Sequence, residues 1–261
     1  MMLVWTLLMI LTMGKKERLC KLKRQELVKH LDLLIHSLNN AFKEKGKVSY
    51  FSCIPIVEAK KNIDNEDGEI CNINVDKLKI PIAEQRHIRP HGNEIKYLEL
   101  TYNGSLNLMC LEEDTHDPFS NLYISVMLKP IEQRPNVHLE CGYHIDRYSE
   151  DDKKDNNEVH PSYHIHYCNN SKFGGEEDGN MAFSMDTPRL SHHPMELFMT
   201  LAEVIGTYNK PVLDKLSKDT TFVRLCRLYA NRIARPYYEM IAKSFTGTRT
   251  DYIPDLNPYL V

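Results

Sequence analysis

Hydrophobic residues recur along this chain with two different spacings. From residue 17 to 45, leucines return every three to five positions among Lys, Arg, Glu and His, which is typical of an amphipathic helix that ends at Gly46. The middle third alternates every second residue, as strands do, and helical spacing returns after Pro194. The pattern predicts an α+β protein with an N-terminal helix, an antiparallel sheet of five or six strands and a helical segment over residues 194–245.

The middle third predicts an antiparallel meander. Its first two strands, 97–102 and 105–111, flank Asn103-Gly104, a dipeptide that favours the tight turn of a hairpin. Residues 48–57 also have a strand-like pattern, interrupted by Pro55, and the polar stretch that follows predicts a loop or a small insertion. The further predicted strands are residues 122–128, 138–148, 163–167 and 181–185.

Capping residues divide the C-terminal segment into three helices. Pro194 suits the first turn of a helix that runs to Gly206. Asn209 opens a short helix, and Asp219 caps a longer one that ends near Arg235.

The first 13 residues are almost wholly apolar and precede Gly14-Lys15-Lys16. They are too few to span a bilayer, which takes about 20 residues, and they lack the basic start and cleavage site of a secretory signal. Three interpretations remain open: an over-extended start upstream of Met13, a segment that contacts a membrane, and an element buried in the fold or in a dimer. We therefore separate residues 1–16 from a single domain over residues 17–261, and we expect no stable membrane span.

Composition narrows the class of protein. The chain of 261 residues carries 33 Lys and Arg against 36 Asp and Glu. This balance excludes a protein whose whole surface is basic and binds polyanions such as nucleic acids. Its seven cysteines include no CxxC pair, and an odd number cannot pair completely, which indicates a reducing, cytoplasmic location.

Histidines gather in one part of the chain. Seven of the 12 lie between residues 138 and 193, where even spacing would place about 2.6. In CGYHIDRY the apolar residues alternate with His144 and Asp146, and in SYHIHY they alternate with His164 and His166. Alternation in a strand sends each polar pair to the face opposite the apolar residues.

Pairing of these two strands would bring the four side chains together. If Asp146 lies opposite His164, then His144 lies opposite His166, with opposed Cβ atoms about 5 Å apart. Such a group could hold a divalent metal, Zn²⁺, Mn²⁺ or Fe²⁺, or two of its histidines could act as base and acid in phosphodiester cleavage. A purely structural interpretation competes, because the solvent face of a strand must be polar and tolerates His.

Two further groups of residues fit a nucleic-acid substrate. The first, near the strands, comprises His160, Arg189 and His193. Arg189 would bind phosphate there. The second comprises Arg224, Arg227 and Arg235, on one face of the last predicted helix. This face could follow a phosphate backbone, although a basic solvated face is the commoner explanation.

The stretch HPSYHIHY at 160–167, followed by TPRLSHHPMELFMTLAEVI at 187–205, is similar to a family of small uncharacterised prokaryotic proteins. In that family HPxxHxH precedes PR, a spacer, a Pro and an amphipathic helix, and some members are encoded near defence or toxin–antitoxin genes. The resemblance implies a shared fold core and no established reaction. The chain departs from the pattern in the insertion at 169–179, which puts the continuation of the strand after His166 in doubt. The residues that carry the resemblance are His160, Pro161, His164, His166, Pro188, Arg189 and Pro194.

Together these features predict a cytoplasmic prokaryotic defence or toxin-type effector that acts as a His-dependent or metal-dependent nuclease or phosphodiesterase. The alternative is a non-catalytic subunit of a defence complex, which binds a protein partner encoded alongside it.

Overall fold

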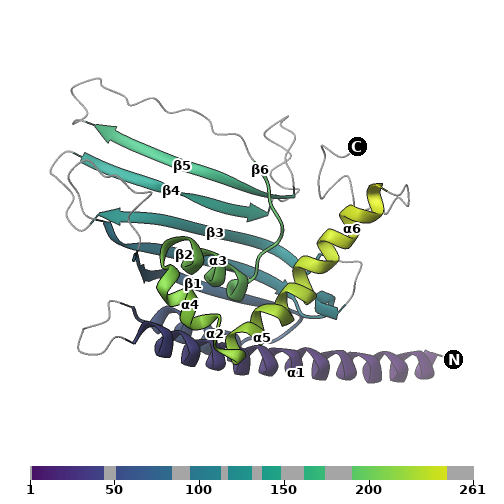
Figure 1. Ribbon diagram of the computed structural model, residues 1–261. Coiled ribbons are helices and arrows are strands. Elements are labelled where there is room, and N and C mark those ends of the chain that lie inside the picture. The colour runs from purple at the N-terminus through teal and green to yellow at the C-terminus, as the bar shows by residue number, and fades with distance from the viewer. Residues whose placement is uncertain are drawn as a thin grey trace.

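The computed structural model describes residues 2–43, 51–83, 95–112, 117–130, 137–147, 162–173 and 190–245. They form a six-stranded antiparallel sheet in which each strand pairs with the next along the chain (Figure 1). The strands are β1 (Ile70–Pro81), β2 (Ile95–Asn107), β3 (Phe119–Pro130), β4 (Val137–Arg147), β5 (Tyr163–Phe173) and the short β6 (Leu190–Ser191). The predicted α+β class and meander are confirmed.

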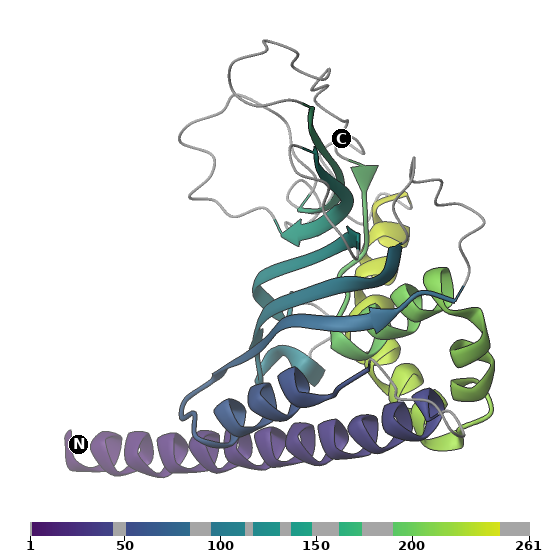
Figure 2. The same cartoon turned by 90° about the vertical axis from the view of Figure 1, so that its left-hand side faces the viewer.

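The helices lie on one side of the sheet and along its edge. They are α1 (Met2–Phe42), α2 (Ile54–Asp64), α3 (Leu197–Tyr208), α4 (Lys210–Leu216), α5 (Thr220–Tyr229) and α6 (Arg235–Phe245). Figure 2 shows α3 to α6 grouped on one side, with α1 and α2 running below the first strands. Within the described ranges, no helix is both long and apolar enough to cross a membrane.

The core lies between the sheet and these helices. Every second residue of the central strands is buried, as the period of two requires. The helices contribute apolar residues such as Phe198, whose ring stacks on Tyr229 with centroids 4.4 Å apart. The fully buried strand residues include Leu98, Leu100, Tyr102 and Ile124.

The predicted hairpin at Asn103-Gly104 is wrong, because β2 continues through both residues and pairs with β1 on one side and β3 on the other. The buried positions keep their period of two from Leu98 to Leu106 across this dipeptide. A Cβ on Gly104 would lie 2.7 Å from the hydroxyl oxygen of Tyr102, so the Tyr102 side chain fills the space above the glycine. Here the glycine makes room for an aromatic ring and does not form a turn.

Two further predictions fail between residues 51 and 81. Residues 54–64 form α2, where the sequence predicts a strand and a loop. Pro55 lies in the first turn of this helix, where a backbone N–H would have no intrahelical acceptor, so the missing N–H of proline costs no hydrogen bond. Ile56, Ala59 and Ile63 form the buried face of this helix. Strand β1 then occupies residues 70–81 of the predicted loop.

Helix ends also differ from the predictions. α1 begins at Met2 and includes the apolar lead, whereas the pattern predicts a start near Glu17. α3 begins after Glu196, so Pro194 precedes the helix. Asp219 caps α5 as predicted, but a π-helical turn at Ala230–Ala234 separates α5 from α6. Gly46 and the predicted strand at 181–185 lie outside the described residues.

The close contact of β3 with β4 generates a stability prediction. A Cβ on Gly142 would lie 2.1 Å from the Val126 carbonyl oxygen, so Gly142→Ala forces the two strands apart. We expect this variant to lose about 2–3 kcal/mol of unfolding free energy, measured by urea denaturation. The control is Gly14→Ala in α1, where no atom lies within 4 Å of the added Cβ and the better helix propensity of Ala stabilises slightly. Equal stabilities of the two variants would contradict the packing at Gly142.

Candidate functional site

The pairing of β4 with β5 has the register that the sequence predicts. Asp146 lies opposite His164, and His144 lies opposite His166. Ile145, between the two polar residues of β4, is 1% exposed and belongs to the core. The four polar side chains therefore point to the face of the sheet opposite the core.

Asp117 fixes this register from outside the two strands. Its Oδ1 accepts a hydrogen bond from the Tyr163 hydroxyl at 2.5 Å, and its Oδ2 accepts one from Arg147 Nε at 2.9 Å. Arg147 and Tyr163 are themselves register partners at the ends of β4 and β5. The Asp117 side chain is only 7% exposed, so both bonds form in surroundings that strengthen them.

The four polar side chains, which we call the His–Asp cluster, contact one another in sequence. Asp146 Oδ1 lies 2.8 Å from His164 Nε2, and Asp146 Oδ2 lies 3.4 Å from His144 Nε2. His144 Nε2 lies 3.3 Å from His166 Nδ1, with the two rings nearly perpendicular. One proton between these two nitrogens can reside on either ring, because each can donate or accept.

Burial differs across the cluster. The His164 side chain is 6% exposed, whereas the His144 and Asp146 side chains are 19% and 28% exposed. Asp146 Oδ1 is itself sealed from solvent and accepts no hydrogen bond from the described residues, although His164 Nε2 is close to it. His164 Nε2 therefore lies against the inner oxygen of the carboxylate, while His144 and His166 lie nearer the solvent.

Strand β3 adds an aromatic residue that the sequence analysis missed. Tyr123 is the register partner of Asp146, and this residue is 39% exposed. It stacks on the His144 ring with centroids 5.9 Å apart. The signal was present in the alternation of LYISVML, which places Tyr123 on the polar face, but finding it required the β3–β4 register.

The remaining predicted residues are placed differently. His193 Nδ1 and the Tyr238 hydroxyl share a hydrogen bond at 3.1 Å, and the His193 ring stacks on His192. Burial and the neighbouring His192 lower the pKa of His193 to about 4, so this ring is neutral at pH 7. Its contacts among the described residues do not include the His–Asp cluster. His160 and Arg189 lie outside those residues.

The three arginines of the predicted basic stripe do not join the cluster. Arg224 and Arg227 are exposed on α5, among the helices on the core side of the sheet. Arg235 begins α6 and forms an ion pair with Glu239 at 3.4 Å. The π turn between α5 and α6 shifts the helical register by about one residue, so Arg235 leaves the face that the sequence predicts.

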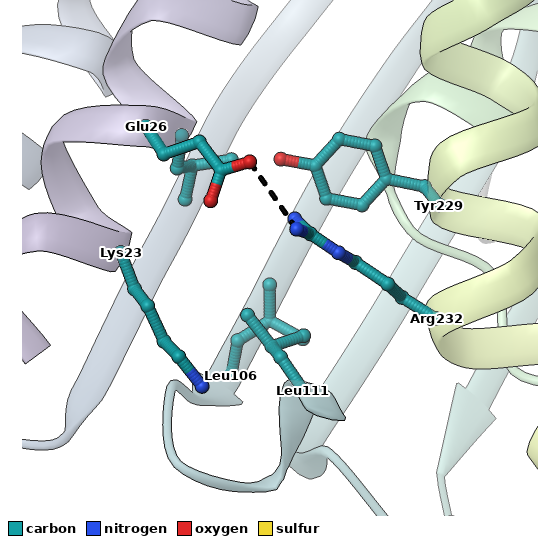
Figure 3. Close-up of a pocket in the computed structure, with 7 residues that line it drawn as sticks. Lys23, Glu26, Leu106, Leu111, Tyr229 and Arg232 are labelled. Atoms are coloured by element: carbon teal, nitrogen blue, oxygen red, sulfur yellow. Dashed lines mark hydrogen bonds and ion pairs between the residues drawn. The ribbon is translucent and has the colours of Figure 1, made fainter. Parts of the chain in front are cut away.

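A second group of polar residues joins α1 to the π turn after α5 and to the backbone just after β2. Arg232 donates to Glu26 Oε1 at 3.2 Å (Figure 3). Lys23 donates to the Leu108 carbonyl oxygen at 3.0 Å. These side chains line a small pocket together with Tyr229. Because each charged group here bonds another part of the fold, we assign the group to the packing of α1.

Metal binding receives no direct support from the described geometry. In the ranges that the structure describes, no three His, Cys, Asp or Glu side chains are arranged to hold a metal ion. The His–Asp cluster instead has the direct contact of a short proton relay between His166 Nδ1 and His144 Nε2, with Asp146 Oδ2 beside the same His144 nitrogen.

Comparisons with protein-family models, with curated proteins and with solved structures give no match to this chain. The resemblance to a prokaryotic family based on HPSYHIHY stays a prediction. Strand β5 does continue through residues 169–173, the part of the departing segment that the structure describes.

A buried carboxyl group at the start of α3 generates a prediction about pH. Glu196 caps α3 by accepting bonds from the backbone N–H groups of Phe198 and Met199, and it is 1% exposed. Burial raises the pKa of Glu196 from 4.5 to about 8, against the opposing effect of the two backbone bonds. The folded protein therefore holds this proton more tightly than the unfolded chain, and the associated stability is full below about pH 4.5 and lost as the pH rises through about 8.

We expect Glu196→Gln to remove this pH dependence. Between about pH 4.5 and 8 the variant should gain stability relative to the wild type, by up to about 1.4 kcal/mol for each tenfold difference in proton affinity between the two states. Denaturation curves at several pH values measure the effect. Glu203→Gln, on the exposed side of the same helix, is the control. Parallel pH profiles for all three proteins would show that Glu196 does not titrate in this way.

Proposed function

We propose that this protein is a phosphodiesterase of the nuclease type and that the His–Asp cluster is its acid–base site. The observation that supports the proposal is that Asp146 Oδ2 and His166 Nδ1 both approach His144 Nε2 on one face of the sheet. General acid–base groups need this combination of a partly exposed imidazole and partners that orient it.

In the proposed reaction His166 exchanges protons with the substrate. A water oxygen attacks phosphorus and forms the new P–O bond, while its proton moves to His166 Nε2. The proton on His166 Nδ1 passes to His144 Nε2, and the Asp146 carboxylate compensates the charge of the imidazolium that forms. The bond from phosphorus to the leaving oxygen then breaks, and the reverse transfer gives this oxygen the proton, which restores the starting state.

A nucleic acid is the substrate class that the surroundings favour. The exposed ring of Tyr123 lies beside His144 and offers a stacking surface, and every nucleobase has a face that can stack on it. Arg189 remains the proposed phosphate ligand on sequence grounds. A role as a cytoplasmic prokaryotic defence or toxin-type effector is proposed from the family resemblance.

The test is cleavage of labelled RNA and DNA, single-stranded and duplex, by the purified full chain. We expect His166→Ala to reduce the cleavage rate by about 10²- to 10⁴-fold, the usual contribution of a general acid–base group, with little change in melting temperature. Asp146→Asn should reduce it as well, because the neutral amide cannot compensate the imidazolium. His36→Ala, which removes an exposed histidine of α1, is the matched control and should leave the rate unchanged.

Three results would decide against this proposal. Cleavage that continues at the wild-type rate in both His166→Ala and Asp146→Asn would exclude the His–Asp cluster as the active site. One equivalent of Zn, Mn or Fe, detected by emission spectroscopy on untagged protein and required for activity, would replace the proton relay with the metal-dependent alternative. Absence of cleavage, together with loss of a protein partner from the double variant His164→Ala and His166→Ala, would support the interaction subunit.

A further inference from the structure

The first part of α1 lies apart from the rest of the fold. Both cartoon views show this end of the helix extending past the sheet and past the other helices (Figures 1 and 2). Every residue from Gly14 to Leu19 is exposed, and Cys20 is the first buried side chain among those of α1 that the structure describes. The fold therefore buries none of residues 14–19, and its contact with them includes an ion pair between Lys16 and Glu69 at 2.5 Å.

The residues that precede Gly14 are apolar on all sides of a helix. Thr6 and Thr12 are the only polar residues from Met2 to Met13, and the backbone of this segment is helical. A dimer seam needs an apolar stripe with a polar back, whereas a helix that is apolar all round suits a protein interior or a lipid phase. Twelve residues give about 18 Å of helix, roughly half the thickness of a bilayer's hydrocarbon core.

A group of basic residues follows directly. Lys15, Lys16, Arg18 and Lys21 are all exposed, and Glu17 is the one acidic residue among them. We call these four cations the basic collar. Basic residues at this position attract the anionic headgroups of a membrane surface, even though the whole chain has a net charge of −3.

We propose that α1 docks the protein on an anionic membrane, with residues 2–13 inserted into one leaflet and the basic collar at the headgroups. The order along the helix, an apolar end followed by cations and then by a face buried in the fold, matches the order of layers from the hydrocarbon to the protein. Because the inserted part is too short to span the bilayer, the protein would lie on one side of it.

Trp5 reports directly on this docking, because it is the single tryptophan of the chain and lies in the apolar segment. On mixing the full chain with vesicles of phosphatidylcholine and phosphatidylserine, we expect the Trp5 emission to shift to the blue and to be quenched by lipids brominated on their acyl chains. Vesicles of phosphatidylcholine alone should give a weaker effect. We expect Lys15→Glu with Arg18→Glu to weaken binding to the anionic vesicles by about 25-fold or more, since each surface cation contributes about fivefold.

The matched control is Lys29→Glu with Lys218→Glu, which changes the net charge equally at exposed positions outside the collar and should bind nearly as the wild type does. Trp5 emission that brominated lipids do not quench would overturn the proposal. A blue shift without vesicles that grows with protein concentration, with a dimer in sedimentation, would also overturn it, because a second copy would then be the occupant. Nuclease activity in solution is independent of this result.

Discussion

Asp117 holds β4 and β5 in the register on which the whole site depends. Its carboxylate bonds Tyr163 and Arg147 at once, and these two residues face each other across the strand pair. A slip of one residue would turn Ile145 outward and direct His144 toward the apolar core, where an imidazole without partners is costly. The hydrogen bonds of one buried carboxylate and the burial of one isoleucine thus select the same pairing.

The pairing of β4 with β5 could be predicted from the sequence because it follows from the alternation of apolar and polar residues within two neighbouring segments. Two segments that alternate apolar and polar residues, joined by a polar connection, leave few registers that bury one face, and the structure has the predicted one. The same reasoning failed at Asn103-Gly104, where a turn-forming dipeptide lies inside a strand. There the unbroken period of the buried positions was the better signal, since packing against the core outweighs local turn preference.

Other features could not be read from one chain because they depend on distant contacts. Tyr123 joins the site only through the pairing of β3 with β4, and Asp117 is 30 residues from the Arg147 that it bonds. Similarly, the π turn that moves Arg235 away from Arg224 has no local sequence signature. The cluster was therefore predictable as a set of four residues, whereas the neighbouring Tyr123 and the Asp117 that bonds both strands were not.

The central claim is that the four side chains form one contiguous unit, and NMR of the protein labelled at its histidine rings tests it without any substrate. The His144 and His166 rings, whose centroids lie 4.8 Å apart, should show a cross-peak between their carbon-bound protons. Asp146→Asn should shift the ring signals of His144, His164 and His166 together. Absence of the cross-peak, with ring signals that do not respond to the change at Asp146, would show that the side chains are separate and would contradict the account.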